Sequence, residues 1–378
     1  MSASPNTAGP LADIRVIDLS AVLAGPGIAR HLADFGADVI KVERAGVGDT
    51  SRNLGWRDDD GETHFFKLAN RNKRFIELDL TTEEGRAELL ALVEHADVLV
   101  ENMRPGKLDA LGLTTAVLHE RNPRLVITRV TAFGQTGPYA GRPGFATLAE
   151  AMSGFAALNG AEEGPPTLPP VALTDEVTAL AGAFATMVAL HAGVGQEVDV
   201  NLVESLLQMM GPLPALWLKG GTQQPRLGSG LPYSVPRGAY RTRDDQWIAV
   251  STSADSVAAR VMAMIGLADD ARMATTAQRM EHRAVVEEAM ADWVAQRTLA
   301  EALAGFEAAD AAAAPIYDIA ALTADPHAVE RGIFVEADGY PMQGPAARLS
   351  ATPAVMKWPG RARGSDNGSV LPVDGWPD

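Results

Sequence analysis

The stretch L-A-D-I-R-V-I-D-L-S-A-V-L-A-G-P-G-I-A-R-H-L-A-D-F-G-A-D-V-I-K-V-E-R, residues 11–44, decides the fold. Its apolar residues give a short strand pattern at 14–19, a helical pattern at 27–35 that ends at Gly36, and a second strand pattern at 38–42. A strand, a helix and a strand in this order are typical of a parallel sheet with helices packed on it.

The same alternation continues along the first third of the chain. Thr81 and Glu84 form a capping box that predicts a helix running to Ala96. Further strand patterns lie at 75–80, 97–100 and 125–130. We therefore expect an α/β fold with a Rossmann-like large domain built on a parallel sheet.

The middle of the chain has a different pattern. Helical patterns dominate 148–210 apart from a strand-like segment at 197–201, and a hairpin turning at Asp244 and Asp245 precedes amphipathic helices between 255 and 306. This pattern predicts a smaller α+β domain. The expected division is 1–215 for the first part of the large domain, with linker helices near 190–220, then 222–315 for the small domain, and 316–378 for a return linker and the C-terminal part of the large domain.

Charge and composition exclude several classes of function. The 378 residues have a formal net charge of −16, which argues against nucleic acid or an anionic membrane as a partner because both require a cationic surface. The chain has no cysteine, so disulfides, thiolate nucleophiles and zinc–thiolate sites are excluded. Residues 1–10 lack the charged and apolar regions of a secretion signal, and we expect a cytoplasmic protein.

One apolar span is long enough to cross a membrane. Residues 177–196 contain no charged side chain, but the span is rich in Ala, Gly and Thr and includes His191. We interpret it as a buried core helix.

A dinucleotide site and a metal site are the other obvious candidates. Gly25 and Gly27 follow the first strand, but Arg30 occupies the third glycine position of the fingerprint and Pro26 has no backbone N–H for a phosphate. The seven histidines are scattered without ligand spacing. The sequence therefore predicts neither a nicotinamide or flavin cofactor nor a metal.

The segment P-V-A-L-T-D-E-V-T-A-L-A-G-A-F, residues 170–184, places two carboxylates before a long uncharged run. Asp175 stands where a helix over 176–190 is expected to begin, so it is explained as an N-cap, and Glu176 as a partner of the helix dipole. The same position suits a reactive carboxylate, because a helix N-terminus favours the ionised form. Residues alone leave both interpretations open.

Five ordered segments together resemble the class III CoA-transferases, the CaiB/BaiF family, which also contains acyl-CoA racemases. They are L-A-D-I-R-V-I-D-L-S-A-V-L-A-G-P, F-G-A-D-V-I-K-V-E-R, N-R-N-K-R-F-I-E-L-D-L, A-D-V-L-V-E-N-M-R-P-G and G-Q-E-V-D-V-N-L-V-E-S-L-L. The resemblance implies a homodimer of two interlocked, ring-like chains. It also implies that each ring has a large domain built from both chain ends and a small domain between them.

The resemblance further implies a CoA-transferase that moves an acyl group from an acyl-CoA to a carboxylic acid through an aspartyl mixed anhydride, with coenzyme A as substrate and no metal or redox cofactor. Asp175 matches the attacking aspartate. Arg44 matches a phosphate-contacting position, although a solvated arginine beside Glu43 is the alternative. The remaining predicted CoA-binding positions are Leu23, Ala24, Leu78, Asp79, Leu80, Thr81, Asn102, Met103 and Arg104.

Several alternatives remain beside this one. Leu78 and Met103 are equally explained by core packing, and Arg71, Lys73 and Arg74 by ion pairs instead of a phosphate site. Racemisation is disfavoured because Phe145 and Ala146 replace the His and Asp that carry protons in the racemases.

Other departures concern the substrate. Oxalate is a doubtful acceptor, because the formyl-CoA:oxalate branch has Tyr-Glu at Phe145 and Ala146 and a tetraglycine loop, whose nearest counterpart here is 228–236. An acyl-CoA racemase or isomerase and a non-catalytic CoA-binding homologue are the alternative functions.

Overall fold

The computed structural model describes residues 9–252 and 254–377. Their contacts divide the chain into two compact units. Unit 1 comprises the chain up to residue 155, residues 169–211 and the chain from residue 327 onward, and unit 2 comprises 156–168 and 212–326. Each unit is described by itself.

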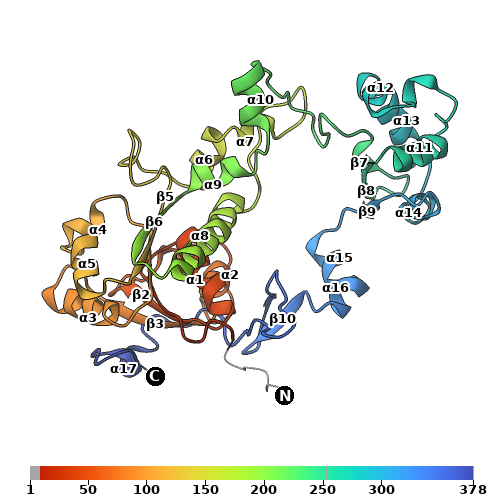
Figure 1. Cartoon of the computed structure of the whole chain (residues 1–378). Coiled ribbons are helices and arrows are strands. Elements are labelled where there is room, and N and C mark those ends of the chain that lie inside the picture. Colours follow the sequence, from red (N-terminus) through yellow and green to blue (C-terminus); the bar gives the residue numbers. More distant parts are fainter. Residues whose placement is uncertain (1–8, 253, 378) are drawn as a thin grey trace. The chain divides into compact units, whose positions relative to one another are not determined.

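Unit 1 is built on a six-stranded sheet in which all paired strands are parallel, in the order β3-β2-β1-β4-β5-β6 (Figure 1). This confirms the predicted α/β class. The order reverses direction at β1, which has β2 and β3 on one side and β4 to β6 on the other. The strands are β1 Arg15–Asp18, β2 Asp38–Arg44, β3 Lys73–Leu78, β4 Val98–Glu101, β5 Val126–Thr131 and β6 Gln196–Asn201.

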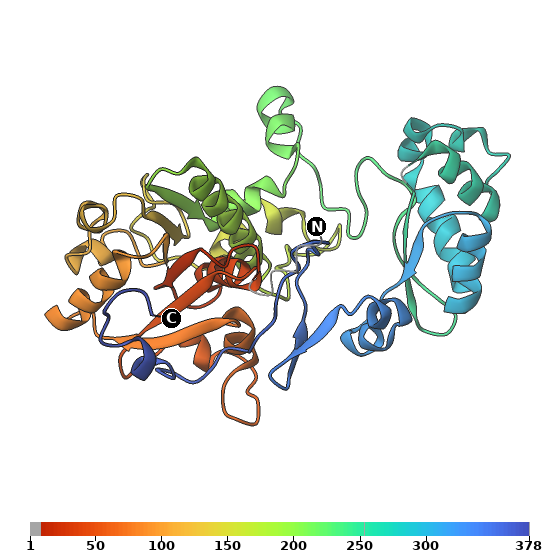
Figure 2. The same cartoon turned by 60° about the horizontal axis from the view of Figure 1, so that its bottom comes forward.

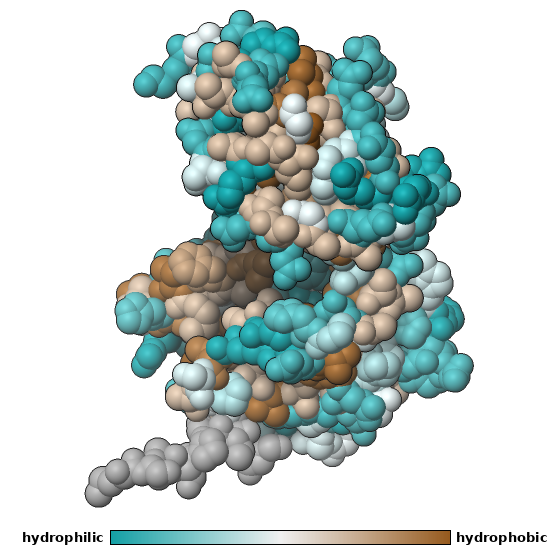
Figure 3. All heavy atoms as spheres, turned by 90° about the vertical axis from the view of Figure 1, so that its right-hand side faces the viewer, coloured by the Kyte–Doolittle hydropathy of each residue, from teal (hydrophilic) through white to brown (hydrophobic). Residues whose placement is uncertain are grey.

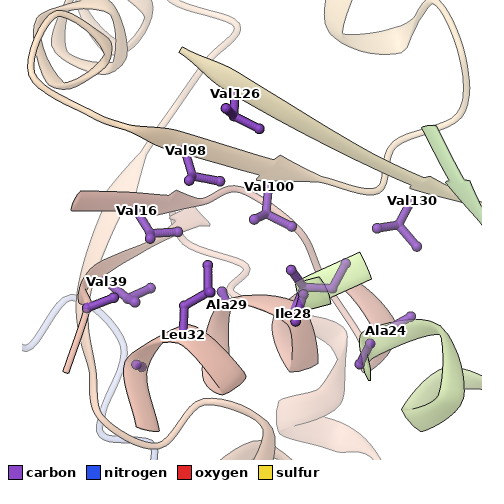
Figure 4. Close-up of a cluster of buried hydrophobic side chains, with 14 of the residues drawn as sticks. Val16, Ala24, Ile28, Ala29, Leu32, Val39, Val98, Val100, Val126 and Val130 are labelled. Carbon is purple, nitrogen blue, oxygen red and sulfur yellow. The ribbon is translucent and has the colours of Figure 1, made fainter. Parts of the chain in front are cut away.

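Both faces of the sheet are buried, and alternate residues of each strand serve opposite faces. On one face, Val16, Val39 and Val98 pack against Ile28 and Leu32 of α1, Ala24–Asp34 (Figure 4). On the other face, the neighbouring isoleucines and leucines of the same strands pack against α3 (Glu83–Val93) and α5 (Thr115–Arg121). Two covered faces explain why these strands read as nearly continuous apolar runs.

The glycines of the A-G-P-G segment allow close packing of the backbone against neighbouring residues. Helix α1 begins at Ala24, three residues earlier than predicted, so this segment is its first turn. A Cβ on Gly25 would lie 2.4 Å from Cβ of Ser20, and one on Gly27 would lie 2.7 Å from Cβ of Ala179 in α8, Leu173–Ala192. Both distances are below van der Waals contact, so the absence of side chains lets α1 approach α8 and the preceding loop.

Helix α8 is a core helix on one side only. Its Ala179, Gly182 and Ala183 are buried, whereas Phe184 on the opposite side is 73% exposed and lies in a row with exposed Leu180 and Val188. By length and composition it is apolar enough to cross a membrane. Its packing on α1 supports the prediction of a core helix for the buried side and leaves the other side uncovered in the single chain.

The capping residue of α3 was predicted wrongly. Thr82 is the N-cap, and its Oγ1 accepts from the N–H of Gly85 at 3.0 Å. Thr81 is drawn into a turn instead, because its hydroxyl and its backbone N–H both donate to Oδ1 of Asp79. The helix therefore begins one residue later than the sequence pattern predicted.

The remaining elements of unit 1 are short. The C-terminal segment, dark blue in Figure 2, follows the edge strand β3: the N–H of Asp366 donates to the carbonyl of Phe75, and the N–H of Phe75 donates to Oδ2 of Asp366. These two bonds fix the C-terminal segment against the large-domain sheet. The elements are α2 His64–Ala69, α4 Lys107–Ala110, α6 Ala146–Met152, α7 Phe155–Leu158 (at the boundary with unit 2), α9 Leu202–Gln208, α16 Pro326–Glu330, β10 Phe334–Ala337, β11 Tyr340–Gln343 and α17 Asn367–Val370, with a 3₁₀ turn at Thr50–Asn53.

Unit 2 contains the predicted hairpin, β7 (Arg237–Arg241) and β8 (Trp247–Ser251), extended by β9 (Ala313–Pro315) into a three-stranded antiparallel sheet. Asp245 adopts φ 60° in the turn, as the hairpin requires. The predicted amphipathic helices pack on this sheet around Val286, Met290 and Phe306. The helices are α10 Leu213–Gly220, α11 Asp255–Met264, α12 Thr276–Glu281, α13 Arg283–Ala295, α14 Leu299–Ala308 and α15 Ile319–Ala324, with a 3₁₀ turn at Ala271–Met273.

Polar and apolar side chains share the surface. Hydrophilic side chains cover much of the face drawn in Figure 3, with apolar side chains between them. Because the formal net charge is −16, cationic groups needed by an anionic ligand must be concentrated locally.

Candidate active site

A cavity of about 700 Å³ lies in unit 1 beyond the carboxyl ends of the parallel strands. Its walls come from the segments that follow β1, β2, β3, β4 and β5, together with the first turn of α8. The strand order reverses between β1 and β4, and ligands of open α/β sheets bind at such a reversal.

Every residue predicted to form the site lines this cavity. These residues are Asp175 and the ten positions predicted to bind CoA: Leu23, Ala24, Arg44, Leu78, Asp79, Leu80, Thr81, Asn102, Met103 and Arg104. The fold thus brings together residues separated by up to 152 positions in the chain, from 23 to 175. Their individual roles remain predictions.

Leu78 and Met103 also belong to the core. Leu78 is buried among the residues that pack on the α3 side of the sheet, and Met103 packs against the same cluster. Each therefore contributes to the cavity wall and to the core, so the packing interpretation and the site interpretation are compatible.

Three arginines line the cavity and are exposed. They are Arg44 after β2, Arg104 after β4 and Arg142 after β5. Within the described residues none of the three forms a salt bridge, and the Arg142 guanidinium stacks 3.8 Å from the ring centre of Tyr139. Sequence reasoning missed Arg142, because it lies in an irregular segment where no periodicity indicates which side chains face a cavity.

The Asn102 side chain forms hydrogen bonds with the backbone of the same chain. Its Oδ1 accepts from the N–H of Ala21 at 2.8 Å and its Nδ2 donates to the carbonyl of Ala21 at 2.6 Å. This reciprocal pair joins the segment after β1 to the segment after β4 across the point where the strand order reverses. Asn102 therefore shapes the cavity with its carboxamide already bonded.

Asp175 is the third residue of α8, not its N-cap. The helix begins at Leu173, after Pro169 and Pro170, and the N–H of Glu176 already donates to the carbonyl of Ala172. The predicted capping role was wrong because the helix starts two residues before Asp175. Among the residues that the structure describes, the Asp175 carboxylate has no hydrogen-bond or ion-pair partner, and it lines the cavity.

The electrostatics of Asp175 also differ from the expectation that the helix N-terminus would favour its ionised form. Burial, with the negative charges of Glu176 and Glu150, raises the pKa of Asp175 to about 6. Desolvation and like charges thus outweigh the helix N-terminus. A carboxylate with this pKa is still roughly nine-tenths ionised at pH 7.

The residues before and after Asp175 are both held. Oγ1 of Thr174 donates to Oε1 of Glu150 at 3.0 Å, and both residues are buried. Glu176 pairs with Arg30 of α1, with 2.9 Å between Oε2 and Nη2. The first turn of α8 is therefore held by one contact to α6 and one to α1. The Asp175 carboxylate, between these contacts, has no partner among the described residues.

A second group of charges lies buried at the end of β1. Asp18 accepts from Nζ of Lys73 at 2.8 Å and lies 3.6 Å from Nζ of Lys41, which pairs with Asp49 at 2.8 Å. Burial raises the pKa of Asp18, but the two lysines outweigh it and hold the pKa below its usual value. We call these four residues the Asp18 cluster.

The Asp18 cluster shapes the cavity loop. Nζ of Lys41 donates to the carbonyl of Ser20, and Oδ1 of Asp49 accepts from the N–H of Val22, which has φ 73°. Positive φ is a rare conformation for a β-branched residue, so these bonds stabilise a strained loop beside the cavity.

The basic residues 71–74, considered above as a phosphate site or ion pairs, form ion pairs. Lys73 bonds Asp18, while Arg71 pairs with Asp34 at 2.6 Å and Arg74 with Asp38. None of the three lines the cavity. Phe145 and Ala146 do line it, so no side chain at these two positions can exchange a proton with a ligand.

Known proteins resemble this chain in sequence and in fold. Residues 11–367 match the model of CoA-transferase family III. This chain belongs to CoA-transferase family III. It is 37% identical to the succinyl-CoA–D-citramalate CoA-transferase of Chloroflexus aurantiacus over 96% of this chain and 93% of the relative. It is 34% identical to the succinate–glutarate CoA-transferase of Agrobacterium fabrum over 98% of this chain and 97% of the relative.

A solved structure agrees with the family assignment. The crystal structure of a CaiB/BaiF family protein from Brucella suis superimposes with a TM-score of 0.86 and 30% identity, over 96% of this chain and 99% of that chain. The predicted resemblance is confirmed, and this chain is an enzyme of CoA-transferase family III.

Proposed function

We propose that Asp175 is the nucleophile of a CoA-transferase reaction that uses the cavity of unit 1. The observation that carries this proposal is the free carboxylate of Asp175 on a wall shared with every position predicted to bind CoA. A carboxylate whose oxygens already accept hydrogen bonds is a poor nucleophile. The Asp175 carboxylate accepts no hydrogen bond from the described residues.

The proposed reaction balances without a metal or redox cofactor. An oxygen of Asp175 attacks the carbonyl carbon of the acyl-CoA, the C–S bond breaks, and CoA leaves as a thiolate, which gives an aspartyl–acyl mixed anhydride. The acceptor carboxylate attacks the Asp175 carbonyl carbon and releases the donor acid. The CoA thiolate then attacks the acyl carbon of the acceptor, which forms the new thioester and restores Asp175.

The position of Asp175 supports each requirement of this scheme. Its pKa of about 6 leaves it ionised near neutral pH, yet more basic than an ordinary aspartate and so more nucleophilic. Partial burial limits the hydration of the carboxylate. Held close to the thioester carbon, it would gain the advantage of an intramolecular reaction.

The arginines support the binding of CoA by an acidic protein. We propose that Arg44, Arg104 and Arg142 meet the phosphates, since Arg pairs with phosphate in a bidentate manner. Leu78 to Thr81 and Asn102 to Arg104 then line the nucleotide and pantetheine portions.

The relatives suggest the acids. Their names include succinyl-CoA, succinate, D-citramalate and glutarate, which are all dicarboxylic acids or derived from them. We propose a small dicarboxylic acid as acyl group and as acceptor. The second carboxylate of such a substrate would require a cationic partner.

We further propose the interlocked homodimer that the family resemblance implies. The exposed row Leu180, Phe184 and Val188 on α8 supports it, because an apolar helix side of this size is unfavourable in water. A second copy of the chain would cover it. The cytoplasmic location stays a prediction.

The test is to trap the anhydride. Wild-type protein and Asp175→Asn are incubated with succinyl-CoA and hydroxylamine, and the peptide containing residue 175 is examined by fragment mass spectrometry. We expect a hydroxamate on Asp175 in the wild type, none in the variant, and transfer to glutarate reduced by roughly 10³-fold or more.

The control is Glu176→Gln, which removes the adjacent carboxylate and should retain the label. Label on residue 176, or unchanged transfer by Asp175→Asn, would contradict the proposal. Bound CoA with no turnover by the wild type across dicarboxylic acyl-CoA esters would favour the non-catalytic homologue.

A further inference from the structure

The first turn of α8 has an unusual distribution of partners. Thr174 and Glu176, on either side of Asp175, each contact a different helix, whereas Asp175 contacts neither. Thr174 reaches Glu150 of α6, and Glu176 reaches Arg30 of α1. Two neighbouring elements thus determine where the backbone carries Asp175.

We infer that Arg30, Glu176 and Glu150 are positioning residues for Asp175, holding the residues on both of its sides and setting the balance of charge around its carboxylate. The inference rests on the proposed role of Asp175 as nucleophile and extends it to three residues outside the cavity wall.

Arg30 is suited to this role by its burial. Its side chain is 7% exposed, while that of Glu176 is 44% exposed, so the ion pair is anchored from the α1 side. Its Nε is buried without a hydrogen-bond partner in the described part of the chain, and Nη1 and Nη2 lie 3.5 and 2.9 Å from the two oxygens of Glu176. The geometry directs the arginine charge at Glu176.

Glu150 acts from the other side with a negative charge. It is buried, and Oγ1 of Thr174 is its hydrogen-bond donor among the described side chains. A buried carboxylate with a neutral donor keeps its field uncompensated, so it opposes a second negative charge nearby. Removal of Glu150 and removal of Arg30 should therefore act on Asp175 in opposite senses.

The charged groups that face this turn are few. On α8 itself there is Glu176, on α6 Glu150, and on α1 Arg30 with His31, whose pKa is lowered to about 3 by burial and by Arg30, so His31 is neutral. Helix α9, which also packs on α8, carries Glu204, exposed to solvent. The pH dependence of Asp175 is thus governed by Glu150, Glu176 and the arginine that compensates Glu176.

The experiment measures the ionisation of Asp175 without relying on turnover. The free energy of unfolding is determined in urea between pH 4 and pH 8 for each protein with and without Asp175→Asn. The stabilisation caused by that substitution rises between the unfolded and the folded pKa of Asp175 and then levels off, so the pH at which it levels off reports the folded pKa. The same proteins are then assayed for the pH dependence of kcat/KM.

The expected shifts have opposite signs. Arg30→Met leaves Glu176 uncompensated and should raise the levelling-off pH by ~0.5–1 pH unit, whereas Glu176→Gln and Glu150→Gln should lower it by a similar amount. The double variant Arg30→Met with Glu176→Gln should return close to the wild type. Glu204→Gln, the matched control, should cause no shift.

The outcomes separate this inference from the proposed function. A purely structural role would destabilise the variants without moving the levelling-off pH, or would move it in one direction for Arg30→Met and Glu176→Gln alike, and either result overturns the inference. Glu176→Gln changes a half-exposed side chain, so it tests the inference even if Arg30→Met does not fold. Opposite shifts in an enzyme without transfer activity would overturn the proposed function alone.

Discussion

Asp18 and Asp175 are both removed from water within unit 1, and they reach opposite ionisation behaviour. Asp18 is fully buried at the end of β1 between two lysines, and its pKa is lowered. Asp175 is partly buried in the first turn of α8 beside two further carboxylates, and its pKa is raised to about 6. Desolvation raises the pKa in both cases, so the partners decide the sign.

This difference separates a charge that supports the fold from a charge available for reaction. The charges of the Asp18 cluster neutralise one another, because each carboxylate is paired with a lysine. Together the four residues hold the loop from Ser20 to Val22. Asp175 has no such compensation, and the contacts are made by its neighbours. A buried carboxylate without a counter-ion destabilises the folded state, which is the usual condition of a functional group in an active site.

The largest expected effect comes from breaking the Asp18 cluster. Asp18→Asn preserves size but leaves Lys41 and Lys73 with one negative partner fewer in a buried site, and we expect a loss of roughly 3–5 kcal/mol in the free energy of unfolding. Urea denaturation at pH 7 measures it. Asp13→Asn, an exposed aspartate on the segment before β1, is the control and should change stability by less than about 0.5 kcal/mol.

An Asp18→Asn protein as stable as the wild type would remove the distinction between the two carboxylates. It would mean that the lysines do not require Asp18 and that the cluster does not hold the loop beside the cavity.

The second-largest effect is an increase in the free energy of unfolding. Asp175→Asn should stabilise the protein at pH 8 by roughly 1–3 kcal/mol, because it removes an ionised carboxylate whose folded pKa is about 6 compared with 3.8 unfolded. With a raised folded pKa, Asp175 loses its favourable contribution as pH rises through this interval. The gain should therefore shrink towards zero as the pH falls to about 4.

Thermal unfolding of wild type and Asp175→Asn at pH 4, 6 and 8 measures this prediction. A variant less stable than the wild type at pH 8 would show that Asp175 contributes to the fold as Asp18 does. A gain independent of pH would assign the effect to something other than ionisation.

The smallest effect is expected at an exposed pair. Arg121 and Glu94 lie 2.9 Å apart with 53% and 42% of their side chains exposed. Glu94→Gln should change stability by less than about 1 kcal/mol, and the change should vanish in 1 M salt, since water and ions screen exposed charges. A larger or salt-independent change would mean that partners matter as much at the surface as in the interior.

Local sequence patterns predicted the parallel strands well because both faces of the sheet are buried. Their apolar runs are separated by breaks such as Gly36. The boundaries were less accurate. The first turn of α1 contains Pro26 and two glycines, which propensity assigns to a loop, but close packing on Ala179 and Ser20 makes these residues helical.

The site was predicted by resemblance, and its residues do share one cavity. What the residues alone left open was the role of Asp175, for which capping and reactivity were equally compatible with the local pattern. The helix start at Leu173 removed the capping role. Arg142 escaped prediction, and so did the anchoring of Glu176 by Arg30, because these contacts join segments far apart in the chain.

The sequence by itself determined the α/β class, the six strands and the family, since strand periodicity and ordered motifs are local properties of the chain. Tertiary structure alone decided which charges are compensated. Asp18 and Asp175 are both aspartates next to apolar segments, and although Glu176 directly follows Asp175, the other charges that act on the two aspartates lie far away in the chain. Ionisation depends on the charges within several ångströms in space, and only folding brings Lys73 to Asp18 and Glu150 to the first turn of α8.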